Sequence, residues 1–238
     1  MTSTPDATAF AELVDATRDQ TSALLGDTIA YSVDDWAAPS RLPGWTRSHV
    51  AAHLVENAKA MIRLCKGLTD GRLRRLYADD ESKRLAIEIG ALADPLTLQI
   101  ELDTTASELQ AAFANLDDVG RTVALGPSLV VTAGELPLAR LSEVVLHHSD
   151  LTGEPPQVSG AVLNALLDFQ LRREANRSNL PPVLIMSDEG FSARAGGDGD
   201  TSTLMGPGID LLWWLARGVD SPAISGLNTE RGDESSAE

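Results

Sequence analysis

Three features that would direct this chain to a membrane or out of the cell are scarce or missing. Cys65 is the single cysteine among 238 residues, so no internal disulfide can form. No run approaches the roughly 18 uninterrupted apolar residues that a membrane-spanning helix needs. The first twenty residues carry acidic side chains where a secretory signal peptide needs a basic patch before its apolar run. We therefore expect a cytoplasmic protein with no membrane partner.

Basic residues are also scarce. The chain has 19 lysines and arginines against 35 acidic residues, a formal net charge of -16. Such a chain would repel the phosphate backbone of nucleic acid, so nucleic acid is excluded as a partner. We expect small-molecule partners and a monomer. Cys65 stands among apolar residues of a predicted helix, which favours a buried hydrophobic side chain over a reactive thiol.

Helical periodicity dominates the first two thirds of the chain. Apolar residues recur at helical intervals in four long segments, 9–25, 47–68, 95–116 and 137–151. Thr46 is placed to cap the second helix, Asp94-Pro95 to start the third, and Gly153 to end the fourth. A charged passage, 70–92, is also expected to be helical, and 121–136 to form a loop or small hairpin. These segments predict a four-helix bundle over residues 1–153.

The pattern changes after Gly153. One helix, 160–179, precedes three short runs at 181–188, 190–196 and 202–206, which turn signals separate. A helix over 207–218 is expected to cover one face of the resulting sheet. We therefore predict an α+β protein: the bundle, a small C-terminal α/β domain over 154–226 with a short antiparallel sheet, and a disordered acidic tail over 227–238.

All four histidines lie in two of the predicted bundle helices. His49 and His53 share a face of the second helix, and Glu143 and His147 share a face of the fourth, because residues four apart project together. In a bundle such faces can converge on one metal ion. His148 should point elsewhere, since it lies about 100° further round its helix. Spacing alone does not decide whether His49 or His53 belongs to the site.

Three ligands would leave one coordination position of a zinc ion open, which is typical of a catalytic and not of a structural site. The same ligand set could hold iron, nickel or manganese. The alternative interpretation is that these histidines are hydrogen-bonded core or surface residues, because pairs spaced four apart are common in helices.

Three motifs resemble the mycothiol-dependent maleylpyruvate isomerase family: "LPGWTRSHVAAHLVENA", "ARLSEVVLHHSDL" and "GPGIDLLWWLARG". They occur in the family's order and at its separations, over nearly the whole chain up to the tail. The resemblance implies a DinB-like metal-binding bundle, a smaller α/β domain after it, and an active site in the cleft between the two.

The resemblance also implies the site residues. It makes His53 a zinc ligand together with Glu143 and His147, mycothiol the thiol cosubstrate, and Arg217 a catalytic residue. An alternative for Arg217 is a cation that interacts with the helix dipole. One departure concerns an arginine that tends to precede the ligand glutamate in the family, where this chain has Ser142.

The implied reaction is the cis-trans isomerisation of maleylpyruvate to fumarylpyruvate by addition of a thiolate, bond rotation and elimination. One alternative is a mycothiol S-transferase that detoxifies electrophiles. Another is a non-catalytic zinc-binding module, in which Trp213 and Trp214 line a ligand pocket; we favour a role for both in covering the small sheet. The basic stretches "GRLRRL" and "LRREANR" are interpreted as solvated helix faces.

Overall fold

The computed structural model describes residues 7–72, 75–126, 129–175 and 180–226 of the chain. They fall into two compact units, Met1–Val162 and Leu163–Glu238, which divide inside a helix. Each unit is described separately below. The acidic tail expected over 227–238 lies outside the described residues, and the domain limits expected from the sequence remain a prediction.

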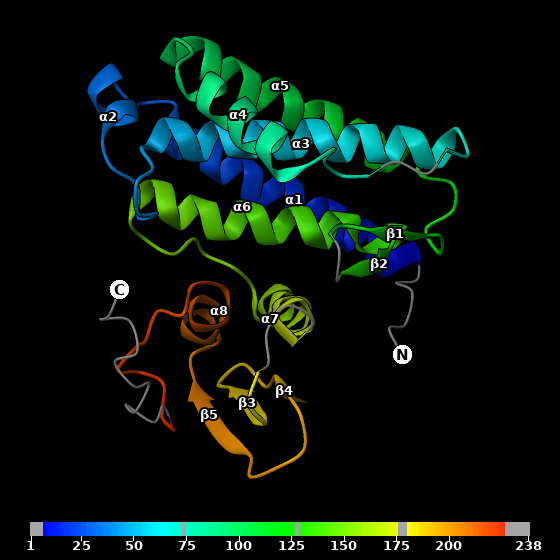
Figure 1. The fold of residues 1–238 in the computed structure, drawn as a ribbon, viewed down its shortest axis with the longest axis vertical. Helices are drawn as coiled ribbons and strands as arrows, with labels where there is room; N and C mark the ends of the chain where they lie inside the picture. The colour runs from blue at the N-terminus through cyan, green and yellow to red at the C-terminus, as the bar shows by residue number, and fades with distance from the viewer. Residues whose placement is uncertain (1–6, 73–74, 127–128, 176–179, 227–238) are drawn as a thin grey trace. The chain divides into compact units, whose positions relative to one another are not determined.

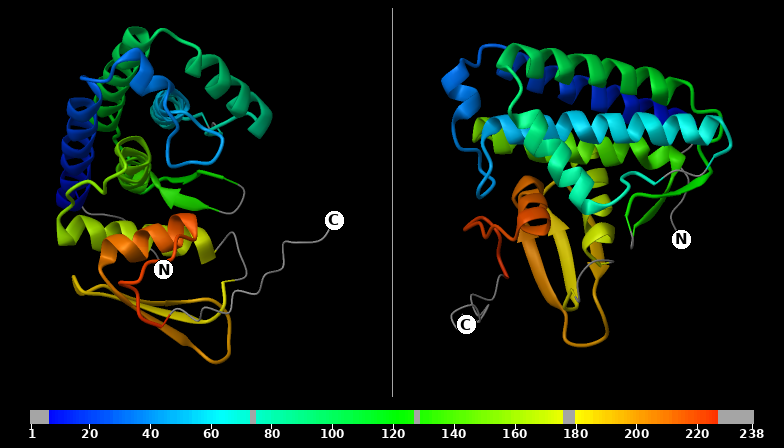
Figure 2. Two further views of the ribbon diagram at one scale, coloured as in Figure 1. Left: turned by 90° about the vertical axis from the view of Figure 1, so that its left-hand side faces the viewer. Right: turned by 45° about the horizontal axis from the view of Figure 1, so that its top comes forward.

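The first unit is built around four long helices, which confirms the predicted bundle. They are α1 (Ala7–Thr28), α3 (Arg47–Thr69), α5 (Pro95–Ala114) and α6 (Leu136–Thr152). In Figures 1 and 2 the four run side by side; α3 packs against α5 and α6, and α1 packs against the same two helices. Side chains such as Leu54, Leu102 and Val144 fill the space between them and are at most 3% exposed.

Local signals set the ends of these helices as predicted. Thr46 caps α3 through a capping box with His49, and Asp94 accepts hydrogen bonds from the first turn of α5, which Pro95 opens. Gly153 ends α6 at a φ of 87°, a left-handed conformation that glycine adopts without steric cost.

The passage expected to be helical over 70–92 is helical only in its second half. Gly71 adopts a positive φ of 70° after α3, and Asp79 accepts a hydrogen bond from the Ser82 backbone N–H to start α4 (Asp80–Ala91). The residues described between these points form a non-helical connection. Within "GRLRRL", Gly71, Arg72, Arg75 and Leu76 lie outside any helix, so the helix-face interpretation was wrong for them; the two residues between lie outside the described residues.

Two smaller elements complete the first unit. A short helix that the sequence analysis did not predict, α2 (Val33–Ala37), buries Trp36 against the bundle core. The expected hairpin is present as β1 (Thr122–Ala124) and β2 (Val130–Thr132), paired antiparallel with Val123 opposite Val131. A single 3-10 turn, η1 (Ala133–Glu135), then leads directly into α6.

The second unit contains the expected three-stranded sheet, but the sheet is mixed. After α7 (Gly160–Ala175), β3 (Val183–Ser187) pairs antiparallel with β4 (Ser192–Ala195) and parallel with β5 (Ser202–Gly206). The expected all-antiparallel arrangement was wrong for β5. β4 runs antiparallel to β3, so it ends beside the first residue of β3. From there the chain crosses to the opposite edge of β3 and forms β5, which runs in the same direction as β3.

The closing helix α8 (Gly208–Arg217) packs on β3 and β5 within this unit. Leu211, Leu212 and Leu215 are its buried large side chains, whereas Trp213 and Trp214 are only partly buried. The expected role of the two tryptophans in covering the sheet remains a prediction. Among the residues described in the two units, no helix is both long and apolar enough to span a bilayer.

Candidate metal centre

Three side chains from two helices of the bundle converge in its interior. Glu143 Oε2 on α6 lies 2.9 Å from His53 Nε2 on α3 and 3.4 Å from His147 Nε2 one turn further along α6. All three ligand-type atoms lie within 4.8 Å of one another. The two histidines are 6% exposed. The i, i+4 spacing places Glu143 and His147 on one face of α6, and the packing of α3 on α6 adds the second imidazole.

This group fits a divalent metal such as zinc. It offers two imidazole nitrogens and a carboxylate oxygen, which is a donor set of catalytic zinc sites. Asp150 Oδ2 lies 2.8 Å from His147 Nδ1, and both side chains are buried. A carboxylate in this position holds the proton on Nδ1, so that Nε2 presents its lone pair towards the other two ligands. The sequence analysis missed Asp150, although its position three residues after His147 puts it within reach on the same helix.

The electrostatics of the group favour metal-binding protonation states in two of the three ligands. Burial alone would raise the pKa of Glu143, but hydrogen bonds from His147 and His53 outweigh burial and hold the pKa well below its usual range. Burial lowers the pKa of His53 to about 4, against an opposing hydrogen bond to Glu143. At neutral pH Glu143 is therefore ionised and His53 is neutral.

His147 differs from His53 in its surroundings. Burial lowers the pKa of His147, but hydrogen bonds to Asp150 and Glu143 outweigh it and raise the pKa above its ordinary value. His53 packs its ring against Trp45, with ring centroids 5.8 Å apart, and its Nδ1 is buried without a partner among the described residues. Ring packing, and not a second hydrogen bond, therefore orients His53.

The other two histidines have separate structural roles. His49 Nδ1 lies 2.7 Å from Thr46 Oγ1 in the capping box of α3, and His49 Nε2 lies 3.4 Å from Glu88. His148 Nε2 lies 2.8 Å from Asp27 Oδ2 on α1, away from the ligand group, as its position on the helix predicted. The structure thus brings His53, and not His49, next to Glu143.

A buried cation lies one turn before Glu143. Arg140 is 3% exposed, and its Nη1 donates to the Leu54 carbonyl at 2.9 Å and to Asn57 Oδ1 at 2.8 Å. Burial lowers the pKa of Arg140 to about 10, with the charge of Glu143 opposing the change, so the guanidinium is charged at neutral pH. The charge of Arg140 therefore favours the ionised form of Glu143. The sequence analysis did not predict these partners of Arg140.

Tyr77, in the connection between α3 and α4, and Lys83, in the first turn of α4, are two further groups of this environment. Burial raises the pKa of Tyr77 to about 12, and the charge of Glu143 adds to this effect. Lys83 Nζ lies 4.7 Å from the centre of the Tyr77 ring, and the charge of Lys83 contributes to the low pKa of His53. Tyr77 and Lys83 are thus within electrostatic range of the ligand group, which no local sequence signal predicts.

Arg217, the fourth predicted site residue, is the last residue of α8 and belongs to the second unit. It is exposed, and Gly218 ends the helix after it at a φ of 64°. This position also suits the helix-dipole alternative, because a cation in the last turn is stabilised there. Its catalytic role remains a prediction.

Cys65 is buried, as expected, at 1% exposure, and burial raises its pKa to about 12. We expect the native protein at pH 8 to react with iodoacetamide at least about a thousandfold more slowly than the urea-unfolded chain, since the thiolate is the reactive form. Mass spectrometry of timed samples would measure both rates. Native labelling at the rate of the unfolded chain would contradict this expectation.

The same pKa shift predicts the sign of a pH effect on stability. The folded-state pKa of Cys65 lies above its ordinary value near 9. The unfolded chain therefore loses this proton first, and the contribution of Cys65 to stability is complete below about pH 9 and declines as the pH rises towards 12. Unfolding by urea at pH 8 and pH 10, compared with Cys65→Ala, would isolate this contribution.

Comparison with known proteins places this arrangement in a family. A sequence-family model described as the mycothiol maleylpyruvate isomerase N-terminal domain matches residues 8–152, more than half of the chain. A crystal structure of the mycothiol-dependent maleylpyruvate isomerase has the same fold, with a TM-score of 0.79 and 21% identity over 90% of this chain and 91% of that one. A histidine-to-alanine mutant of the mycothiol-dependent maleylpyruvate isomerase gives a TM-score of 0.76 and 19% identity over 90% and 95%.

No curated protein sequence matches the chain. The two crystal structures share its fold at low sequence identity, whereas the family model spans the whole bundle and includes all three converging side chains. The chain therefore belongs to the family described by the mycothiol maleylpyruvate isomerase N-terminal domain.

Proposed function

We propose that this protein is a zinc-dependent, mycothiol-using isomerase that converts maleylpyruvate to fumarylpyruvate. The observation that carries the proposal is the convergence of His53, Glu143 and His147 inside the bundle of a chain from this family. Family membership supports the type of cosubstrate and substrate, and the buried side chains support the metal.

The proposed metal ligands are Nε2 of His53, Nε2 of His147 and the carboxylate of Glu143. A zinc ion held by these three groups would act as a Lewis acid that lowers the pKa of a thiol and so favours its nucleophilic thiolate form. Asp150 fixes the orientation of His147, and the Arg140 charge favours the ionised form of Glu143, so the ligand group is organised by neighbours that need not move.

The proposed reaction needs no oxidant or reductant. The mycothiol thiolate adds to one carbon of the cis double bond, and the electron pair moves onto the conjugated carbonyl oxygen as an enolate. The former double bond is then single and rotates. When the enolate collapses, the double bond re-forms as trans and the thiolate leaves unchanged.

The charge of the substrate and the charge of the protein together indicate what Arg217 would do. Maleylpyruvate carries two carboxylates, and the chain has a formal charge of -16, so a local cation is needed to attract the substrate. We propose that Arg217 binds a carboxylate bidentately and stabilises the developing enolate, for which a planar guanidinium is well suited.

The proposal is tested by metal analysis and product identification on the full chain. Protein purified without chelators should contain stoichiometric zinc. It should convert maleylpyruvate to fumarylpyruvate, observed by proton NMR, only when mycothiol is added, and the mycothiol concentration should stay constant. Glutathione and cysteine serve as control thiols.

The alternative outcomes are distinct. If mycothiol is consumed and a stable adduct accumulates, the protein is an S-transferase. If zinc is bound but no thiol-dependent turnover of any tested electrophile occurs, the site belongs to a non-catalytic module. Wild-type protein without bound metal would overturn the proposal.

A further inference from the structure

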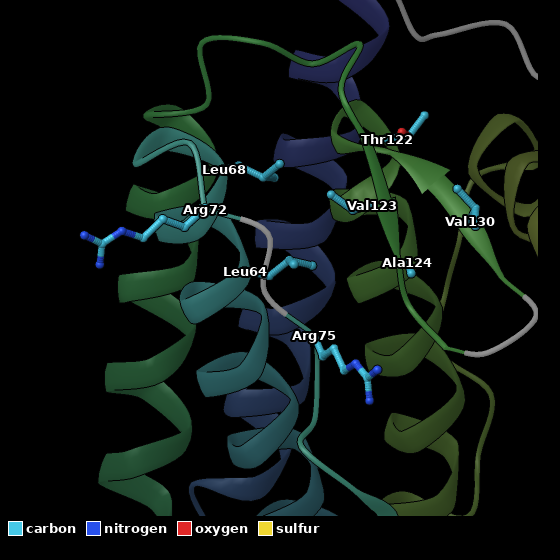
Figure 3. A pocket seen from close by; sticks show the side chains of 8 residues that line it. All are labelled: Leu64, Leu68, Arg72, Arg75, Thr122, Val123, Ala124 and Val130. Atoms are coloured by element: carbon cyan, nitrogen blue, oxygen red, sulfur yellow. The ribbon is translucent and has the colours of Figure 1, made fainter.

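A pocket of about 430 Å³ lies where the end of α3, the connection that follows it and the β1–β2 hairpin meet, as Figure 3 shows. This volume is within the range of about 300–1,000 Å³ that is usual for small-molecule sites. The pocket belongs to the first unit and lies about three helical turns further along α3 than His53, which is roughly 16 Å. It is therefore separate from the candidate metal centre.

The floor of the pocket is apolar. Leu64 and Leu68 of α3 and Val123 of β1 point into the space between the helix and the hairpin in Figure 3. Val130 on β2 also lines the pocket, although 62% of its surface is exposed. An accessible cavity bordered by aliphatic side chains gains free energy by taking up an apolar group.

The charge around the pocket is positive. Arg75 and Arg72 line it, and none of its lining residues within the described ranges is acidic. Arg121, next to Thr122 of the hairpin, donates from Nη1 to the Leu68 carbonyl at 2.9 Å, which holds a third guanidinium at the same end of the bundle. An anion is therefore favoured here, although the protein as a whole is strongly acidic.

Arg75 has no carboxylate partner among the described residues, and neither does Arg72. In contrast, Arg47 pairs with Asp35 at 3.6 Å and Arg172 with Asp168 at 2.9 Å. In Figure 3 the Arg75 side chain extends towards the hairpin beside Ala124, whereas the Arg72 side chain points away from the pocket. Arg75 is thus the cation placed to bind a ligand at this pocket.

We propose that this pocket binds an amphipathic carboxylate, with its apolar chain against Leu64, Leu68 and Val123 and its carboxylate on the Arg75 guanidinium. A planar guanidinium can donate two parallel hydrogen bonds to a carboxylate. The site does not depend on metal or on the proposed isomerase activity, so the two proposals fail or succeed separately.

Isothermal titration of the full chain with octanoate, below its micelle concentration, tests the proposal. Octanoate should bind saturably, and octan-1-ol and acetate should each bind at least about tenfold more weakly, because each lacks one half of the recognised structure. Equal affinity for octanoate and octan-1-ol, or no saturable binding of octanoate up to millimolar concentration, would overturn the proposal.

Two variants and one matched control locate the site. Arg75→Gln should weaken octanoate binding about tenfold or more, since it removes a charge-assisted contact. Val130→Glu should also weaken it, by placing a like charge at an exposed position on the rim. Arg72→Gln, in the same connection but directed away, should change the affinity less than about threefold. Equal losses in Arg72→Gln and Arg75→Gln would show non-specific attraction and contradict the assignment.

Discussion

His53→Ala is expected to abolish stoichiometric metal binding and thiol-dependent turnover while the bundle remains folded. The substitution removes one of three converging ligands. Loss of an outer-shell partner of a metal ligand already costs about 10- to 100-fold in metal affinity, so loss of a ligand itself should cost more than about 100-fold. Metal content by mass spectrometry and the isomerase assay measure the two effects.

A readout independent of activity is the thermal shift produced by metal. A ligand that binds only the folded state at a thousandfold excess over its dissociation constant stabilises it by about 4 kcal/mol. Added zinc should therefore raise the melting temperature of metal-free wild-type protein, and this shift should disappear in His53→Ala.

His49→Ala is the matched control for His53→Ala, because His49 lies one turn earlier on the same helix and is outside the ligand group. It removes part of the capping box and should cost about 1 kcal/mol of stability, but it should keep metal binding and turnover. If both variants lose metal equally, or if neither does, the assignment of His53 as a ligand is wrong.

Arg140→Ala is expected to reduce the free energy of unfolding by about 3–5 kcal/mol, which is typical when one partner of a buried charged network is removed. The Arg140 side chain is 3% exposed, so its loss leaves a cavity. The substitution also removes the donor to Asn57 Oδ1 and the positive charge near Glu143. Urea unfolding followed by circular dichroism would measure the change.

Two comparisons separate the causes. Arg140→Met restores most of the packing and should recover part of the loss, and combining Arg140→Met with Asn57→Leu should recover more, because the buried Asn57 acceptor is then no longer left unpaired. Arg63→Ala, an exposed arginine on α3, should change stability by less than about 0.5 kcal/mol. A loss in Arg140→Ala no larger than in Arg63→Ala would show that the buried network contributes nothing.

The helices were predictable because their signals are local. The periodicity of the bundle helices and the residues at their ends, such as Thr46, Asp94 and Gly153, act within one or two turns of themselves. The same is true of the Glu143 and His147 pair, whose common face follows from helical geometry. Local signals failed where the structure depends on packing: the extent of α4, and the strand partner of β5, which no turn residue specifies.

The choice between His49 and His53 shows the limit of spacing arguments. Four residues along a helix return to almost the same face but differ by about 6 Å in height. Only the position of α6 against α3 decides which of the two heights meets Glu143, and that position is a property of the whole bundle. The partners of Arg140 on α3 depend on the same docking and were beyond sequence analysis for the same reason.

The separation of His53 from Glu143 by 90 positions has a consequence for biosynthesis. A chain emerging from the ribosome carries a single member of the triad until α6 has been made, because Glu143 and His147 both lie in that helix. One imidazole alone holds a divalent ion weakly. Loading of the proposed site with metal would therefore have to follow synthesis of α6 and its docking on α3, and a bound ion would close a long loop, as a cross-link does, only in a chain that has already folded correctly.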